Sequence, residues 1–239
     1  LLQNITSLAL VGFGSLRRMA NINTQYANDF KMSLPHVHEL QISQVHFQKD
    51  FFLELPLLKN LKLTQIRLSK DAVEHILDLA KNLEGLCLRV TNHDLSEINI
   101  KSESLLKLTI ASYNSHVSIE ASNLTAAYVF ATEVTLNCPK LINFTSAYNC
   151  KVTNLNCTKL RFVETSKLPQ LSTESVEILT IIASAQSIEI PANTNFPKLR
   201  HFSSRTLMLI TSDTVEFPVL ECFSATGILQ FWNLDLNTK

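Results

Sequence analysis

The sequence predicts an α/β solenoid, in which successive coils of the chain stack around one hydrophobic interior and one parallel β-sheet. Two observations predict it. A short apolar pattern recurs along nearly the whole chain, and a second apolar ladder lies between its copies in the middle of the chain. The composition agrees, because 46% of the 239 residues are hydrophobic and a chain of this length can bury one large core.

The recurring pattern is apolar-x-x-apolar-x-apolar, as in Leu58, Leu61 and Leu63. Alternate side chains of a strand point to opposite faces, so the last two apolar residues of each copy point inward together. One such strand cannot bury its apolar row alone, whereas stacked neighbours form a continuous core and a parallel sheet. From Val37 onward the copies follow one another at short intervals. The eleven copies begin at Ile5, Val37, Leu58, Leu83, Leu105, Leu124, Leu141, Leu160, Val176, Leu199 and Leu220.

Some copies are degenerate, because a small or polar residue replaces the third apolar one: Ser146, Thr165, Ser204 and Ala225. The second ladder is formed by apolar residues five positions before a copy begins: Ile100, Ile119, Leu136 and Leu155. The segments 136–141 and 155–160 are nearly identical, so stacking should bring Cys138 onto Cys157 as small core residues.

The segment that closes each coil is expected to change along the chain. Residues 69–81 have the pattern of a helix, with Ser69 as N-cap and an apolar stripe formed by Ala72, Val73, Ile76, Leu77 and Ala80. Between Leu105 and Val176 the copies lie closest together, which leaves little room for a helix and favours short return strands. We therefore predict a leucine-rich-repeat solenoid with a concave parallel β-sheet, helix-backed in the first half and strand-backed with short repeats in the middle. It forms one domain over residues 1–239.

Several stretches resemble the repeat region of plant F-box leucine-rich-repeat proteins. They are LPLLKNLKL at 55–63, LEGLCL at 83–88, INIKSESLLKLTI at 98–110, IEASNL at 119–124 and CPKL at 138–141. The resemblance runs from Leu34 to Leu220. It implies that the repeats hold a substrate protein, while an F-box module docks onto the scaffold of a cullin-RING ubiquitin ligase. No segment of this chain matches an F-box, so we expect the chain to be a fragment of a longer protein.

The chain carries no HExxH, P-loop or GxSxG motif, and Gly12-Phe-Gly14 lacks the rest of a dinucleotide-binding fingerprint. His36 and His38 share one side of a predicted strand, but no nearby residue completes a metal-binding set. We therefore expect no enzyme activity, no cofactor and no metal. A formal net charge of zero argues against a nucleic-acid partner, and no apolar stretch is long enough to span a membrane.

Localisation and function leave alternatives open. Five cysteines, an odd number without CxxC spacing, favour the cytoplasm or nucleus. Sequons at Asn4, Asn123, Asn143 and Asn156 point instead to secretion. Three hypotheses remain: the substrate-recognition region of an F-box adaptor, the repeat domain of an intracellular nucleotide-binding immune receptor, and an extracellular recognition domain.

The outward positions of the predicted sheet form the candidate contact surface for a protein partner, because solenoids bind on their concave face. Large apolar side chains at five of them predict one apolar patch with a charged rim, as in binding hot spots. The alternatives are a covering segment, or a register slip that would turn these side chains into the core. The predicted binding residues are Arg89, Lys107, Tyr128, Phe130, Phe162, Glu164, Ile178, Ile182 and Arg205.

Overall fold

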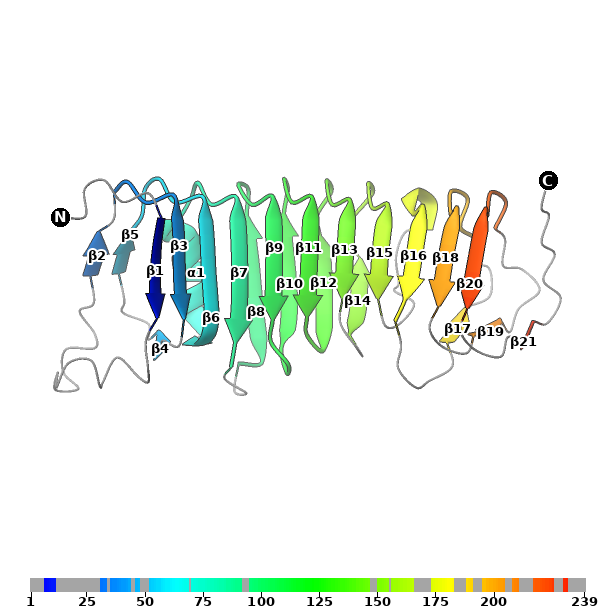
Figure 1. Ribbon diagram of the computed structural model, residues 1–239, viewed down its shortest axis with the longest axis horizontal. Helices are drawn as coiled ribbons and strands as arrows, with labels where there is room; N and C mark the ends of the chain where they lie inside the picture. The colour runs from blue at the N-terminus through cyan, green and yellow to red at the C-terminus, as the bar shows by residue number, and fades with distance from the viewer. Residues whose placement is uncertain are drawn as a thin grey trace.

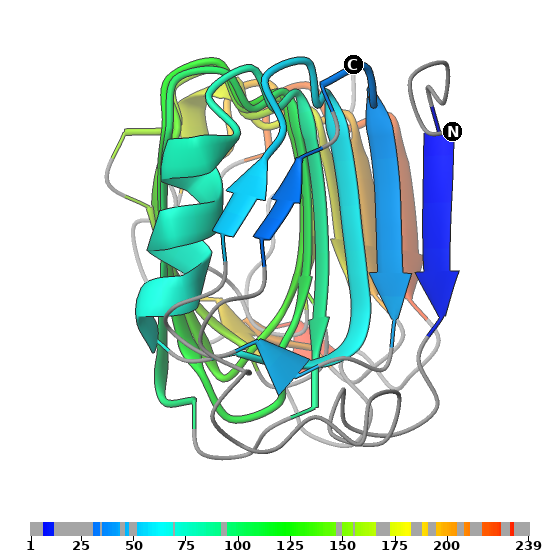
Figure 2. The same ribbon diagram turned by 90° about the vertical axis from the view of Figure 1, so that its left-hand side faces the viewer.

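The chain forms an elongated stack of coils with two layers, and strands β1 (Ser7–Val11) and β21 (Gln230–Phe231) lie toward opposite ends of the stack (Figure 1). The computed structural model describes residues 7–11, 31–33, 35–43, 46–47, 52–68, 70–91, 95–146, 150–154, 156–165, 173–182, 188–190, 195–204, 208–210, 217–225 and 230–231. The described coils pass once through a front layer and most of them once through a back layer, as the end-on view in Figure 2 shows. The predicted solenoid is therefore confirmed.

The front layer is one parallel sheet, and each predicted copy of the apolar pattern supplies one of its strands. A short strand, β4 (His46–Phe47), adds to the far end of β6. The strands pair in chain order: β1 (Ser7–Val11), β3 (Glu39–Ser43), β6 (Asn60–Leu68), β7 (Gly85–Val90), β9 (Lys107–Ala111), β11 (Ala126–Phe130), β13 (Asn143–Ser146), β15 (Phe162–Thr165), β16 (Ile178–Ile181), β18 (His201–Ser204) and β20 (Cys222–Ala225).

The inner rows of this sheet are the predicted apolar ladder. Leu61, Leu86 and Leu108 are register partners on β6, β7 and β9, and all three are buried. The degenerate positions 146, 165 and 204 are buried as well. Ser146 donates a hydrogen bond to Thr165 Oγ1 on the next strand, over 2.9 Å. A hydroxyl can therefore replace an aliphatic group inside the stack, because its neighbour satisfies it.

The back layer is built from several pieces. A two-stranded sheet, β2 (Lys31–Ser33) and β5 (Phe52–Glu54), is followed by helix α1 (Lys70–Leu79), which packs against β8. A four-stranded sheet continues the layer with β8 (Glu97–Ser102), β10 (His116–Ala121), β12 (Glu133–Asn137) and β14 (Lys151–Asn154). After the 3₁₀ helix η2 (Thr173–Ser175), it resumes with β17 (Ile188–Ile190), β19 (Met208–Ile210) and β21 (Gln230–Phe231).

The helix predicted at 69–81 is present as α1, and its apolar stripe is buried from Ala72 to Ala80. A helix-backed first half is not confirmed beyond this one helix. Among the described residues of that half, α1 is the only α-helix, and strands β2, β5 and β8 supply the other parts of the back layer. The coil from Leu58 to Leu83 is longer than the coils that follow it, and this length gives it room for a helix.

The second ladder is confirmed for its first members, because Ile119 on β10 is the register partner of both Ile100 and Leu136. Leu155 lies outside the described residues, and the partner of Leu136 on β14 is Asn154. Cys138 and Cys157 are both buried free thiols. A hydrogen bond with Cys157, together with burial, raises the pKa of the Cys138 thiol. The two cysteines therefore stack as core residues, as predicted.

Tight turns lead into the front strands at the upper edge of Figure 1. Within them the amide of Leu141 donates to the carbonyl of Cys138, and Leu199 donates to Phe196 in the same way. The next carbonyl then accepts two amides from the following coil: Lys59 O accepts from Glu84 N and Gly85 N, over 2.8 and 2.9 Å. This repeated bonding fixes one coil on the next. No helix of the described residues is both long and apolar enough to cross a membrane.

Candidate interaction face

The outward side of the front sheet is the candidate site, and its register is the one expected from the sequence. Tyr128 on β11 lies between Thr109 on β9 and Thr145 on β13. Its side chain is 44% exposed, whereas Val129 beside it in the chain is buried. The residues predicted to point outward therefore do so on the described strands, and the alternative of a slipped register is excluded.

The face is shallowly concave. In the end-on view of Figure 2, β1 and β3 at one end and β18 and β20 at the other stand further out than the strands between them. The middle strands are therefore set back from the two ends of the face. A broad, shallowly curved sheet face fits a folded or extended protein segment better than a small molecule, which needs a deeper pocket.

The predicted apolar residues fall into two groups. On β11, Tyr128 is joined by Phe130, whose ring packs edge-on against Tyr113 with centroids 4.7 Å apart. On β15 and β16, Phe162 and Ile178 are register partners, and Phe162 is 38% exposed. We call these the aromatic group (Tyr113, Tyr128, Phe130) and the Phe162 group (Phe162, Ile178).

The structure does not bring the two groups into one continuous patch. Strand β13 separates them, and it presents Asn143 and Thr145 to the outside. Ile182 follows the end of β16, where its amide donates to the carbonyl of Thr165. Arg205 lies outside the described residues. That these residues bind a partner stays a prediction.

The charged residues of the face are distributed unevenly. Lys62 on β6, Arg89 on β7 and Lys107 on β9 are all exposed on three adjacent strands. Glu164 is half-buried on β15, beside Thr145 and Thr180. Lys107 and Arg89 therefore flank the aromatic group on one side only, and Glu164 belongs with the Phe162 group.

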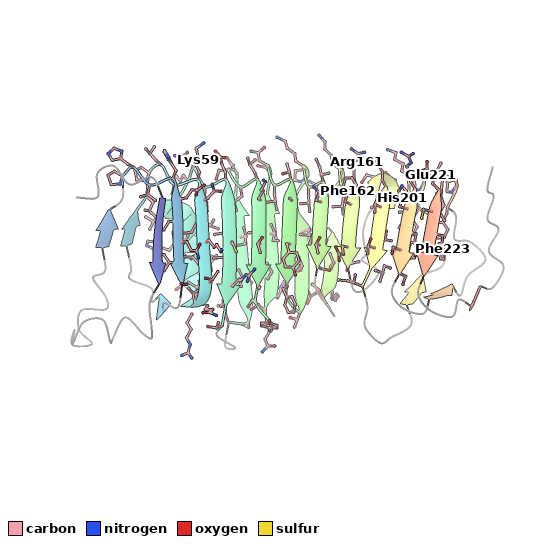
Figure 3. The ribbon with its side chains drawn as sticks, viewed as in Figure 1. Lys59, Arg161, Phe162, His201, Glu221 and Phe223 are labelled. Atoms are coloured by element: carbon pink, nitrogen blue, oxygen red, sulfur yellow. The ribbon has the colours of Figure 1, made fainter. Side chains whose placement is uncertain are left out.

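A row of ion pairs along the upper edge of the face was not foreseen from the sequence. Each pair joins consecutive coils: Lys59 contacts Glu84 over 2.9 Å, and Arg161 binds Glu177 through two hydrogen bonds of 2.9 and 2.7 Å. Arg200 donates two further bonds to Glu221, over 2.8 and 2.6 Å. Figure 3 shows Lys59, Arg161 and Glu221 along this edge.

These pairs have electrostatic consequences for their members. The hydrogen bonds from Arg161 hold the pKa of the Glu177 carboxyl below its ordinary value and raise the pKa of the guanidinium. Glu221 likewise raises the pKa of Arg200. A sequence signal existed, because each of these residues directly follows the first apolar residue of a copy and the sign alternates between neighbouring coils. The pairs link each coil to the next one along the chain. They lie at the edge of the face and do not cover the outward side chains of its strands.

Metal and cofactor chemistry has little support in the geometry. Within the described ranges, no three His, Cys, Asp or Glu side chains lie together in a way that could hold a metal ion. The absence of a metal, a cofactor and an enzyme activity stays a prediction for the chain as a whole. What the described face offers is a broad surface of hydrogen-bonding, cationic and aromatic side chains.

Comparisons with known proteins agree with this architecture. Residues 2–152 match the family model described as "FBD-associated F-box protein At5g56370, LRR repeats". No curated protein and no solved structure matches the chain. Because the matched region covers more than half of the 239 residues, the chain belongs to the family of leucine-rich repeats of FBD-associated F-box proteins.

Proposed function

We propose that this chain is the substrate-recognition region of an F-box adaptor of a cullin-RING ubiquitin ligase, and that its front face binds the substrate protein. The observation that carries the proposal is the family match, because its repeats are those of an F-box protein. An F-box module elsewhere in the parent protein would connect the repeats to the ligase scaffold. The family match favours this function over an immune receptor or a secreted recognition domain.

The dimensions of the face suit a protein partner. The front strands from β1 to β20 are stacked at about 4.8 Å and have about five residues each, so the face measures roughly 48 by 16 Å, or about 800 Å². That is about the area that one partner contributes to a standard protein–protein interface. The exposed aromatic side chains on β11 and β15 are of the type that anchors such interfaces.

The proposal assigns no catalysis to the chain. The repeats supply binding and orientation, while the ligase machinery supplies the transfer of ubiquitin to the substrate. It also places the protein in the cytoplasm or nucleus, in agreement with its free cysteines.

Affinity purification of the full-length parent protein from its own cells tests the proposal. We expect a cullin scaffold in the purified material, together with a substrate whose amount rises when the proteasome is inhibited. The variant Tyr128→Asp with Phe162→Asp should retain the scaffold and lose the substrate. Lys101→Glu, on the back sheet, is the control and should retain both. Purified material without a cullin scaffold would contradict the proposal.

A further inference from the structure

Three cations on the front face have no partner within the part of the chain that the structure describes. Lys62, Arg89 and Lys107 are exposed, and none of their side chains forms a hydrogen bond or an ion pair there. Their strands, β6, β7 and β9, are direct neighbours. The face therefore carries a local excess of positive charge, although the net charge of the whole chain is zero.

Several cations elsewhere in the solenoid are matched by a carboxylate on an adjacent coil. This holds at the upper edge for Arg161 with Glu177, and on the back sheet for Lys151, which lies 2.9 Å from Glu133. Lys101 lies 3.5 Å from Glu120 in the same sheet. In-register stacking makes such matching easy, since register partners lie side by side. Three unmatched cations on consecutive strands of the candidate contact face give it a positive charge that the carboxylates of a partner would complement.

The positions of the three cations suit an extended chain. Lys107, Lys62 and Arg89 occupy successive outward positions along the strand direction, on strands about 4.8 Å apart. Their Cα atoms are therefore roughly 8 to 14 Å from one another. Alternate side chains of an extended peptide are about 7 Å apart, so carboxylates at alternate positions can reach separate cations.

The aromatic group lies directly beside these cations. Tyr128 is the register partner of Thr109, and Phe130 is the register partner of Ala111, both on β9. Ala111 in turn is the partner of Arg89 on β7. A ligand lying over the cations therefore also reaches exposed aromatic rings. An anchor side chain that is apolar or aromatic would bury against them and add non-electrostatic affinity.

We infer that the face from β6 to β11 binds an acidic, extended peptide segment with an aromatic anchor, the acids facing Lys62, Arg89 and Lys107 and the anchor facing Tyr128. The inference deepens the proposed function, on which it rests, by giving the chemistry of the substrate segment. A peptide fits better than a nucleic acid, because a backbone binder needs a large basic excess. The carboxylates of Glu39 on β3 and Glu164 on β15 lie on either side of this stretch and would repel a phosphate chain long enough to reach them, whereas a short peptide stays between them.

Fluorescence anisotropy with defined peptides tests the inference on the whole chain. The probe is a fluorescein-labelled peptide in which Asp alternates with Ser around one central Phe. Control probes replace every Asp by Asn, or Phe by Ala, and oligothymidylate of equal charge tests for nucleic-acid binding. Protein variants are Lys62→Glu, Arg89→Glu and Lys107→Glu, with Lys101→Glu as the matched charge reversal on the back sheet. Circular dichroism checks that every variant is folded.

We expect the acidic probe to bind, each front-face reversal to weaken it about fivefold, and Lys101→Glu to leave it unchanged. Binding should also weaken as salt is added. Equal affinity for the Asn probe, tighter binding of oligothymidylate, or an equal loss with Lys101→Glu would overturn the inference. Its failure is distinct from that of the proposed function: a chain that ignores the acidic probe can still come from a protein that co-purifies with a cullin scaffold. A chain that binds the acidic probe, taken from a parent protein that does not co-purify with a cullin scaffold, would contradict the ligase role and leave the peptide inference standing.

Discussion

The front and back layers of this solenoid are made by the same coils, yet they differ in regularity. The front layer is one uninterrupted parallel sheet, whereas the back layer passes from a strand pair to a helix and then to two separate sheets. Every coil repeats the apolar pattern that makes a front strand, while the length of the coil varies along the chain. The back layer therefore absorbs the variation in length. The constant layer is the one that can present a continuous surface to a partner.

The largest expected effect tests whether the two layers enclose one interior. Leu108→Ala on front strand β9 and Leu136→Ala on back strand β12 remove the same atoms from buried positions. Each should lower the free energy of unfolding by about 2 to 5 kcal/mol, measured by urea denaturation. Leu106→Ala, at an exposed position, is the control and should change it by less than about 0.5 kcal/mol. A loss in one layer only would show that the layers do not share a core.

A second prediction tests whether the helix is an essential part of the back layer. Glu74→Pro places a proline inside α1 at an exposed position, where it removes a hydrogen bond and clashes with the preceding turn. The free energy of unfolding should fall by about 3 kcal/mol, whereas Glu74→Ala should leave it nearly unchanged. Thermal and urea denaturation measure both. An unchanged free energy of unfolding in Glu74→Pro would mean that the stability of this coil does not depend on its helix.

A smaller effect on the free energy of unfolding is expected for the buried hydrogen bond between Ser146 and Thr165 in the front layer. Ser146→Ala and Thr165→Val each break the hydrogen bond between the two buried hydroxyls, at a cost of about 1 kcal/mol. The double variant should lose less free energy of unfolding than the sum of the two single losses. Each single variant leaves the other hydroxyl without this hydrogen bond, whereas the double variant removes both hydroxyls. A double-mutant cycle measures this coupling. Strict additivity would mean that the two hydroxyls do not interact.

The smallest expected effect concerns the edge ion pairs in acid. Arg161 lowers the pKa of Glu177 in the folded state, so this pair stabilises the fold above the unfolded value of about 4.3. The contribution is lost as the pH falls through the folded pKa. Stability should therefore decline in acid, and it should decline less in the variant Glu177→Gln. Glu133, paired with Lys151 on the back sheet, should behave in the same way. Identical pH profiles for the variant and the parent would contradict the pairing.

The sequence predicted the front layer well, because an apolar side chain at every second position states directly which face is buried. It also predicted α1, whose stripe from Ala72 to Ala80 has helical spacing. The Arg161–Glu177 pair was not predicted, although its signal was present: each residue directly follows the first apolar residue of a copy, and the two charges are opposite. The candidate patch is divided more than its sequence pattern indicates: Tyr128 and Phe162 are both exposed, but strand β13, with Asn143 and Thr145 on its outer side, lies between them.

The central claim is that successive coils stack one by one, in register, along a single axis. Distances measured by double electron–electron resonance between spin labels at outward positions of the front strands test it directly. Cys87 and Cys222 are first replaced by Ser, and one label is fixed at position 62. Labels at 145, 180 and 203 lie four, six and seven strands away, so the account predicts narrow distances of about 19, 29 and 34 Å. Distances that fail to rise with the number of intervening strands would contradict it.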